Sequence, residues 1–233
     1  MLRVAVVTPY YEESVEMLHH CWQSVAKQTY PCLHVMVADG IPNPVVDDWA
    51  VDHIRLPKSH ADIGSTPRLI GCYHAIGLGV DLVAFLDADN WYRFDHIETL
   101  VDLHAKTGAA FLSCNRMLCR LDGSIMAVCP YTDPEKFIDT SCMMFARDAF
   151  HVLANWVLMP SYAHVIGDRV MLHYIKAAAV RRAHSGEPTV YYRCGKEGVY
   201  ANFGESPPPG VLPVPDYGSA GTRWIADGNP ELS

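Results

Sequence analysis

Long apolar runs are absent from this sequence of 233 residues. The N-terminus has an apolar stretch of only four residues, Val4 to Val7, which is too short for the core of a signal peptide. Elsewhere, charged residues interrupt the apolar runs well before the roughly 20 residues that a membrane-spanning helix needs. We therefore expect a soluble, cytoplasmic protein with no transmembrane segment.

Basic residues are also scarce. The chain has 18 Lys and Arg against 26 Asp and Glu, which gives a formal net charge of −8. Proteins that bind nucleic acid normally present a basic surface, so this balance argues against a nucleic-acid partner. It does not exclude a small anionic ligand, because a local site can oppose the overall charge.

Cysteine is present, but its usual pairing motifs are missing. The eight cysteines are scattered without a C-x-x-C pair, and several lie in apolar runs, as Cys142 does in TSCMMFA. This pattern favours buried, reduced thiols over a disulfide framework. Reduced thiols agree with a cytoplasmic location.

The first half of the chain alternates between apolar, β-branched runs and segments with helical periodicity. This alternation is typical of a parallel sheet flanked by helices. The expected strands are 3–8, 33–40, 52–57 and 81–87, and the expected helices are 12–28, 64–79 and 95–107. The expected helix starts are the acidic residues Glu12, Glu13 and Glu16, the pair Thr66-Pro67, and a capping box of Asp95 and Glu98.

The second half has a different pattern. Asp122-Gly123 between two apolar runs predicts a hairpin. Residues 139–146 and 189–194 are expected to form strands, and residues 166–183 a helix. Beyond Glu205 the chain is rich in Pro and Gly, so we expect one domain over 1–205 and an irregular C-terminal tail over 206–233.

Two aspartates follow the strand expected at 81–87, in the sequence FLDADNWY. Because side chains alternate along a strand, Asp87 and Asp89 are expected to point to one side and Ala88 to the other. The carboxyl end of a central parallel strand is where open α/β sheets bind ligands. Adjacent carboxylates repel each other unless a cation or proton joins them, and Mg²⁺ or Mn²⁺ is the natural partner. The alternative is a pair of solvated loop aspartates, since D-x-D is a short motif.

Other strand and helix ends supply further candidates. Tyr10 and Tyr11 leave the first strand, where a ring can stack on a base or pack in the core. Asp39 ends the second strand, where it can bind a base or ribose or merely cap a turn. Arg68 lies in the first turn of its helix, and a guanidinium beside free N–H groups suits a diphosphate. The alternative for Arg68 is a surface ion pair with Asp62.

Four segments carry a resemblance to a known family. VAVVTPYYEES, VADG, GSTPRLIGCYHAI and FLDADN, in this order and spacing, resemble the family 2 glycosyltransferases of the GT-A fold over roughly residues 3–195. The resemblance implies a Rossmann-like, mainly parallel sheet flanked by helices. Residues 1–110 would bind the nucleotide sugar, and a mixed α+β half over 111–205 would bind the acceptor, with help from the tail.

The same resemblance implies the reaction. A sugar would pass from a nucleotide diphosphate donor, with UDP the commonest nucleotide, to a hydroxyl of a carbohydrate, lipid-linked or other acceptor, with inversion of the anomeric carbon. Asp168, in IGDRVM, matches the family's catalytic base. The sequence has Gly167 where the family often has a second acid, and Asp168 is also well placed to cap a helix.

The resemblance also assigns ligand contacts. Asp87 and Asp89 would hold Mn²⁺ or Mg²⁺, and His184 is a candidate for a further metal ligand. The residues expected to bind the donor are Thr8, Pro9, Tyr10, Tyr11, Glu12, Asp39, Arg68, Asp87 and Ala88.

Two other functions share these motifs. A phosphohydrolase of the haloacid dehalogenase type also uses D-x-D, but usually on its first strand, and with a Thr where this sequence has Trp91. A sugar- or nucleotide-binding domain without activity would keep the GT-A shape, although the intact acids at 39, 87, 89 and 168 favour an enzyme. Trp91 and Tyr92 either wall the acceptor pocket or pack in the core.

Overall fold

Parallel strands with continuous apolar sequences form one half of the sheet. The computed structural model describes residues 1–232. In it, β1 (Val4–Tyr10) lies between β2 (Cys32–Ala38) and β4 (Leu82–Phe85), and β3 (Asp52–Arg55) pairs with β2 at the edge. All three pairings are parallel. β1 and β4 are buried along their whole length, as uninterrupted apolar runs predict.

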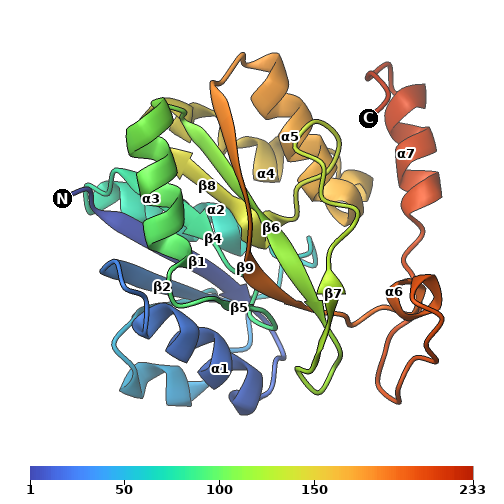
Figure 1. Cartoon of the computed structure of the whole chain (residues 1–233), viewed down its shortest axis with the longest axis horizontal. Helices are drawn as coiled ribbons and strands as arrows, with labels where there is room; N and C mark the ends of the chain where they lie inside the picture. Colours follow the sequence, from blue (N-terminus) through green and yellow to red (C-terminus); the bar gives the residue numbers. More distant parts are fainter. Residues whose placement is uncertain (233) are drawn as a thin grey trace.

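The other half of the sheet is mixed. Its strands are β5 (Trp91–Tyr92), β6 (Phe111–Cys119), β7 (Ile125–Val128), β8 (Met143–Ala146) and β9 (Arg182–Arg193). β8 runs antiparallel to both β4 and β6, whereas β9 is parallel to β6 and antiparallel to β5. The predicted hairpin joins β6 to β7. The order is β3-β2-β1-β4-β8-β6-β9-β5, with β7 beside β6 (Figure 1).

Helices cover both faces of the sheet (Figure 1). α1 and α3 lie on the near face in that view, and α2, α4 and α5 lie on the far face. Their bounds are α1 (Val15–Ala26), α2 (Ser65–Gly77), α3 (His96–Thr107), α4 (Asn155–Leu158) and α5 (Gly167–Ala177), and short 3₁₀ helices span Pro44–Asp48, Thr140–Cys142, Arg147–Val152 and Ser161–Ile166. Within residues 1–232, no helix has both the length and the apolar character needed to cross a bilayer.

The helix starts differ from the predicted caps because other side chains reach the free N–H groups. The Ser14 hydroxyl caps α1, which therefore begins later than predicted. At α2 the cap comes from upstream, since Asp62 accepts hydrogen bonds from the N–H and the hydroxyl of Thr66. At α3 the Asp95 carboxylate binds Arg93 instead of capping the helix, and Oε1 of Gln28 accepts the N–H of Ile97 at 2.9 Å.

α5 is shorter than predicted and β9 is longer. α5 ends at Ala177, Ala179 takes a φ of 53°, and β9 begins at Arg182. The apolar segment after Ala177 suits a helix or a strand by its sequence alone. Pairing with β6 decides the outcome, because that pairing continues along most of β9.

The C-terminal tail, predicted to be irregular, contains a helix. α7 (Tyr217–Ala226) follows the short α6 (Glu197–Asn202), and Figure 1 shows α7 beside the body of the molecule. Asp216 caps α7 by accepting the N–H of Ser219. The ring of Trp224 is buried, and its indole N–H donates to the carbonyl of Pro230 at 2.8 Å. One buried tryptophan therefore anchors a segment whose composition suggested disorder.

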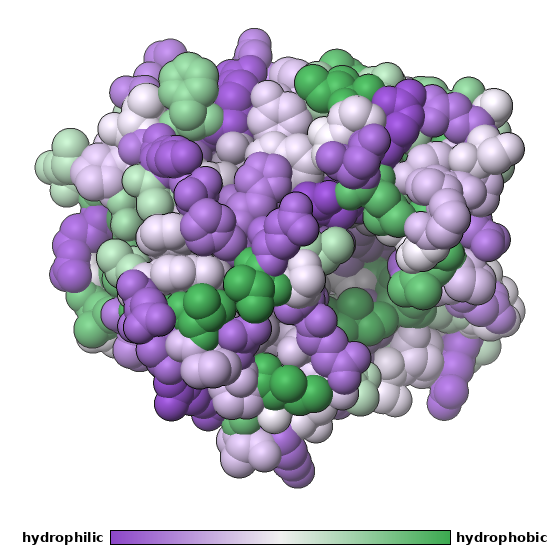
Figure 2. Space-filling view, turned by 90° about the horizontal axis from the view of Figure 1, so that it is seen from below, coloured by the Kyte–Doolittle hydropathy of each residue, from purple (hydrophilic) through white to green (hydrophobic). Residues whose placement is uncertain are grey.

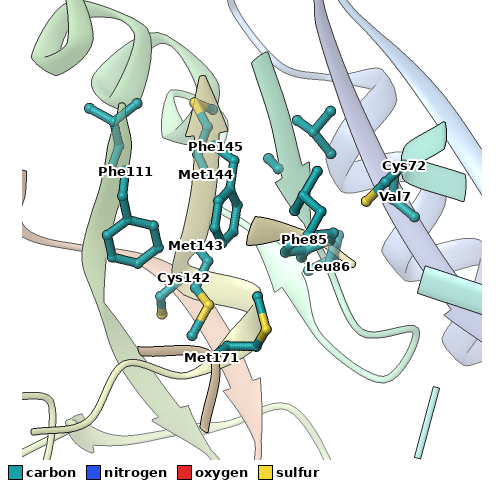
Figure 3. Close-up of a cluster of buried hydrophobic side chains, with 14 of the residues drawn as sticks. Val7, Cys72, Phe85, Leu86, Phe111, Cys142, Met143, Met144, Phe145 and Met171 are labelled. Carbon is teal, nitrogen blue, oxygen red and sulfur yellow. The ribbon is translucent and has the colours of Figure 1, made fainter. Parts of the chain in front are cut away.

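Aromatic side chains join the two halves of the sheet in the core. Figure 3 shows Phe145 of β8 between Phe111 of β6 and Phe85 of β4. The Phe145 ring meets those of Phe111 and Phe85 edge to face, with centroids 5.1 and 5.6 Å away. All eight cysteines are free, and most are buried, as predicted. The core therefore forms without disulfide bonds.

Candidate active site

A cleft opens at the carboxyl ends of β1, β2 and β4. It consists of two adjoining cavities of about 110 and 230 Å³, and both are lined by Ile63, Arg68 and Asp87. The other predicted site residues that line the cleft are Pro9, Tyr10, Tyr11 and Asp39 in the smaller cavity and Asp89 and Asp168 in the larger one.

Asp39 is held in place by the loop that follows β3. Its carboxylate accepts hydrogen bonds from Nδ1 of His60 at 2.6 Å, the His60 N–H at 3.0 Å and the Ser59 hydroxyl at 3.2 Å. Gly40 allows this close approach: it has a φ of +89°, and a Cβ there would lie 2.3 Å from the nitrogen of Ser59. The carboxylate is therefore fixed at the cavity wall before any ligand arrives.

Arg68 is buried, and its partner is the first aspartate of the D-x-D motif. Nη2 of Arg68 donates to Oδ1 of Asp87 at 2.8 Å, and the guanidinium carbon lies 4.6 Å from a ring centroid of Trp156. Within residues 1–232, Nε of Arg68 has no hydrogen-bond partner. The alternative pairing with Asp62 does not occur, because Asp62 caps α2. A buried guanidinium with an unpaired N–H suits an anionic ligand.

Asp87 and Asp89 lie in a turn rather than on the strand. β4 ends at Phe85, and the N–H of Asn90 closes the turn on the carbonyl of Asp87 at 3.0 Å. Both aspartates nevertheless line the larger cavity. Burial, and then the negative charge of Asp87, raise the pKa of Asp89 to about 7. No side chain of residues 1–232 donates a hydrogen bond to the Asp89 carboxylate, so the group is available for a proton or a cation.

The carboxylate oxygens of Asp87 and Asp89 are suitable ligands for a hard divalent cation. Mg²⁺ and Mn²⁺ prefer carboxylate oxygens, and an unpartnered carboxylate with a raised pKa is stabilised by a nearby positive charge. Within residues 1–232, no group of three or more His, Cys, Asp or Glu side chains could hold a metal ion. The remaining ligands of a cation at Asp87 and Asp89 would then be water and phosphate oxygens.

His184 lies outside the cleft. Its Nδ1 bonds to the Ser113 hydroxyl at 2.9 Å and its Nε2 to Oδ1 of Asn115 at 3.1 Å, where β9 pairs with β6. The opposite end of β9 approaches the D-x-D turn, since Nε of Arg193 donates to the Asp89 carbonyl. Both ring nitrogens are occupied away from the aspartates, so the structure does not support His184 as a metal ligand.

Three predicted donor contacts do not line the cleft. The Thr8 hydroxyl points into the core, where it bonds to Nε2 of His34 at 2.9 Å. The Ala88 side chain packs in a small cluster with Tyr10. Glu12 is exposed before α1 and is not among the residues lining either cavity.

Asp168 separates the larger cleft cavity from another of about 450 Å³, because Val165 and Asp168 line both. Burial raises the pKa of Asp168 to about 6, with a further contribution from the charge of Asp139. Asp168 is not the helix cap: that position is Ile166, and the Asp168 carboxylate accepts the adjacent N–H of Arg169 at 2.7 Å. A pKa of this size suits a general base near neutral pH.

The buried ion pair between Arg116 and Asp139, which lines the same cavity as Asp168, was not predicted from the sequence. Asp139 is 7 % exposed and pairs with Arg116, whose guanidinium carbon lies 4.1 Å from the ring centroid of Tyr192. All three residues line the 450 Å³ cavity. The available signal was a charge inside an apolar run, since Arg116 interrupts the sequence of β6.

Trp91 and Tyr92 do not wall a cavity in the cleft. The Trp91 ring stacks on Tyr191 with centroids 5.4 Å apart, and the Tyr92 ring stacks on His96 at 3.8 Å. These contacts lie where β5 pairs with β9. The alternative role, packing, is therefore the one that the structure shows.

Comparisons with known proteins agree with this architecture. The model of the family described as Glycosyl transferase family 2 matches residues 5–140. S. aureus TarS 1-349 in complex with UDP is similar, with a TM-score of 0.63 and 16% identity over 82% of this chain and 60% of that chain. For TarS 1-349 in complex with UDP-GlcNAc the TM-score is 0.63, with 13% identity over 82% and 58%. For S. aureus TarS the TM-score is 0.64, with 15% identity over 86% and 38%.

The chain therefore spans less than two thirds of each of these TarS structures. No curated protein sequence matches it. The family model, however, covers more than half of the chain and includes β1, the Asp39 loop, Arg68 and the D-x-D turn. These matches confirm the predicted fold class and the predicted family. The chain belongs to glycosyl transferase family 2 and has the GT-A fold.

Proposed function

We propose that this protein is a glycosyltransferase that takes a sugar from a nucleotide diphosphate donor, with UDP as the nucleotide. We propose also that the reaction depends on Mn²⁺ or Mg²⁺ and inverts the anomeric carbon. One observation carries the proposal: Asp39, Arg68 and the two D-x-D aspartates line adjoining cavities at one sheet edge. The TarS structures, which contain UDP and UDP-GlcNAc, support the choice of nucleotide.

The smaller cavity suits the nucleoside. Tyr11 is 41% exposed and offers a ring face to a base. The Asp39 carboxylate, already oriented by Ser59 and His60, can accept hydrogen bonds from the base or from ribose hydroxyls. Residues that follow β1, β2 and β3 would thus bind or orient the groups that recognise one nucleoside.

The diphosphate would lie where the two cavities meet. Arg68 lines both cavities, and its buried guanidinium can donate to phosphate oxygens while it holds Asp87. A divalent cation on Asp87 and Asp89 would offset the negative charge that develops on the leaving diphosphate. Burial in the cleft strengthens the contribution of Arg68, because the surrounding medium is less polar than water.

Asp168 would act as the general base. It would accept the proton of the acceptor hydroxyl as that oxygen forms a bond to the anomeric carbon. The bond between the anomeric carbon and the diphosphate oxygen would break on the opposite side, and its electron pair would leave with the nucleotide diphosphate. With a pKa of about 6, Asp168 is mostly ionised at pH 7 and still basic.

A thermal-shift screen tests the proposal. UDP and UDP-sugars should raise the unfolding temperature more with Mn²⁺ than with EDTA, because a ligand that binds the native state stabilises it. GDP and dTDP serve as the nucleotide controls. UDP release in the presence of Mn²⁺ should then accompany transfer to a sugar acceptor. If no nucleotide stabilises the protein, the proposal is wrong, and binding without turnover on a broad acceptor panel would indicate a binding domain.

A further inference from the structure

The 450 Å³ cavity lies on the other side of Asp168 from the donor cleft. Its size is typical of a small-molecule site, for which about 300–1,000 Å³ is usual. Its walls come from the second half of the chain and from the C-terminal segment, including Val214 and Tyr217. Figure 2 shows that the molecule, seen from below, is hollowed on the side of the C-terminal segments.

The C-terminal wall is held in place by specific contacts. The N–H of Glu197 donates to the Leu212 carbonyl at 3.0 Å, and the Leu212 N–H donates to Gly195 at 2.9 Å. Gly198 packs against Val214 closely enough that a Cβ there would lie 2.9 Å from its side chain. The wall is therefore part of the fold.

The lining combines aromatic rings with cations. Four rings contribute to it: Tyr131, Phe137, Tyr192 and Tyr217. Such rings offer flat apolar faces with polar edges, which suit the C–H faces and hydroxyls of sugars. Tyr217 and Asp168 line this cavity together. Burial and then the charge of Asp168 raise the pKa of Tyr217.

The charges that line the cavity are not balanced. Arg116 and Asp139 neutralise each other in a buried pair. The remaining charged residues of the lining are two cations, Arg169 and Lys196, and one acid, Asp168. Neither Arg169 nor Lys196 forms an ion pair with a residue between 1 and 232; the Arg169 guanidinium carbon lies 5.7 Å from the Phe137 ring centroid. The cavity therefore has an excess of positive charge, although the net charge of the chain is −8.

We propose that this cavity is the acceptor site and that the acceptor is a saccharide bearing a phosphate or carboxylate group, which Arg169 and Lys196 bind. The assignment as acceptor site rests on the proposed function, because it uses Asp168 as the base shared by the two cavities. The preference for an anionic saccharide rests on the lining alone. Aromatic faces would hold the sugar ring, and the cations would hold the anionic group.

Titrations with simple sugars test the inference on the full-length protein. Glucose 6-phosphate and glucuronic acid are the two anionic probes, and glucose is their neutral counterpart, with binding followed by ligand-observed NMR. Both anionic probes should bind about tenfold more tightly than glucose, as charge-assisted hydrogen bonds predict. The preference should weaken as salt is raised. A preference for one anionic probe over the other distinguishes phosphate from carboxylate.

Variants of Arg169 and Lys196 test whether the anionic sugars bind in the 450 Å³ cavity. The double variant Arg169→Ala/Lys196→Ala should bind all three sugars equally, whereas the charge-preserving variant Arg169→Lys/Lys196→Arg should keep most of the preference. Lys27→Ala removes an exposed cation from α1 and should leave the preference unchanged. Unfolding curves of each variant check that the fold is retained.

The outcomes separate this inference from the proposed function. Equal binding of glucose and the anionic sugars, failure of both anionic sugars to bind, or an unchanged preference in the Ala double variant would each overturn the inference. UDP with Mn²⁺, titrated into the same samples, reports on the donor cleft independently. UDP binding without anion preference removes only the anionic-acceptor inference. Anion preference without UDP binding removes the donor proposal and the acceptor role that rests on it, but keeps the site for anionic saccharides.

Discussion

The guanidinium of Arg68 donates a hydrogen bond to Oδ1 of Asp87 at 2.8 Å, from the first turn of α2 to the turn after β4. The bond makes the first aspartate of the D-x-D motif part of an ion pair with a buried arginine, whereas the second, Asp89, forms no ion pair with any residue of 1–232. The two carboxylates are therefore inequivalent before any metal or donor binds.

Loss of the Arg68 side chain should weaken donor binding. In Arg68→Met, Asp87 loses its partner and the diphosphate loses a donor, so we expect UDP affinity to fall by about tenfold or more and stability by about 1–3 kcal/mol. Titration with UDP and chemical unfolding measure the two effects. Arg55→Ala, at an exposed arginine of β3, is the control and should change neither by much. Unchanged UDP affinity in Arg68→Met would contradict the phosphate role.

Asp89 should make the metal-free protein less stable as the pH rises. Its pKa is about 7 in the folded protein and near 3.8 when unfolded. The native state therefore binds more protons between these values, and the free energy of unfolding should fall by roughly 1–3 kcal/mol from pH 4 to pH 7. Asp89→Asn should make this slope shallower and leave the part that comes from the raised pKa of Asp168, as measured by denaturant unfolding in EDTA.

Bound metal should offset the loss of stability that the ionised Asp89 carboxylate causes at higher pH. A cation replaces the proton on the carboxylate, so Mn²⁺ should stabilise the wild-type protein more at pH 7.5 than at pH 5.5. Thermal unfolding with Mn²⁺ and with EDTA, at both pH values, measures this difference. Equal stabilisation of wild type and Asp89→Asn by Mn²⁺ would place the metal elsewhere.

Replacement of Asp168 should abolish transfer but spare donor binding. We expect Asp168→Asn to lower kcat by about 10²–10⁴-fold, the usual contribution of a general base, with UDP affinity within about twofold of wild type. Wild-type activity should fall as the pH drops below about 6, where Asp168 becomes protonated. Asp148→Asn, at an exposed acid, should behave as wild type. Wild-type turnover in Asp168→Asn would assign the base to another group.

Replacement of Gly40 by alanine should destabilise the protein, whereas replacement of Gly77 by alanine should not. Gly40→Ala places a Cβ 2.3 Å from the Ser59 nitrogen in a left-handed conformation, so we expect a loss of about 1–3 kcal/mol and weaker UDP binding as Asp39 loses its support. Gly77→Ala adds a Cβ with no atom within 4 Å near the end of α2 and should stabilise the protein by up to about 1 kcal/mol. Unfolding curves and UDP titrations compare the two.

Local sequence patterns were enough to predict the donor half of the sheet. Apolar runs marked β1, β2 and β4, and polar residues at their ends marked Tyr11, Asp39 and Asp87, because strand ends meet at one edge whatever the details of packing. The partner of Arg68 was not predictable in the same way. Asp62 is nearer in sequence, but its carboxylate caps α2, and only the crossing of α2 over the sheet brings Asp87 within reach.

The second half was harder to predict because its contacts are distant in the chain. His184 suited a metal by residue type, yet pairing of β9 with β6 fixes its ring on Ser113 and Asn115. The cavity beside Asp168 joins Arg116, Lys196 and Tyr217, which come from three separate elements. α7 was not predicted because it buries only two residues, Ala220 and Trp224, within a stretch rich in Gly and Pro.

The pairing of β8 with β4 has a consequence for how such enzymes can diversify. The donor-side residues end at the D-x-D turn just after β4, whereas the residues around the 450 Å³ cavity lie between Arg116 and Tyr217. The β4–β8 pairing is a seam that holds these two parts of the chain together. The seam consists of a short antiparallel ladder, Leu82–Ala84 against Met144–Ala146. A chimera that keeps the residues up to the D-x-D turn and imports another family member's downstream portion should retain its nucleotide and exchange its acceptor, so evolution can vary one substrate while conserving the other.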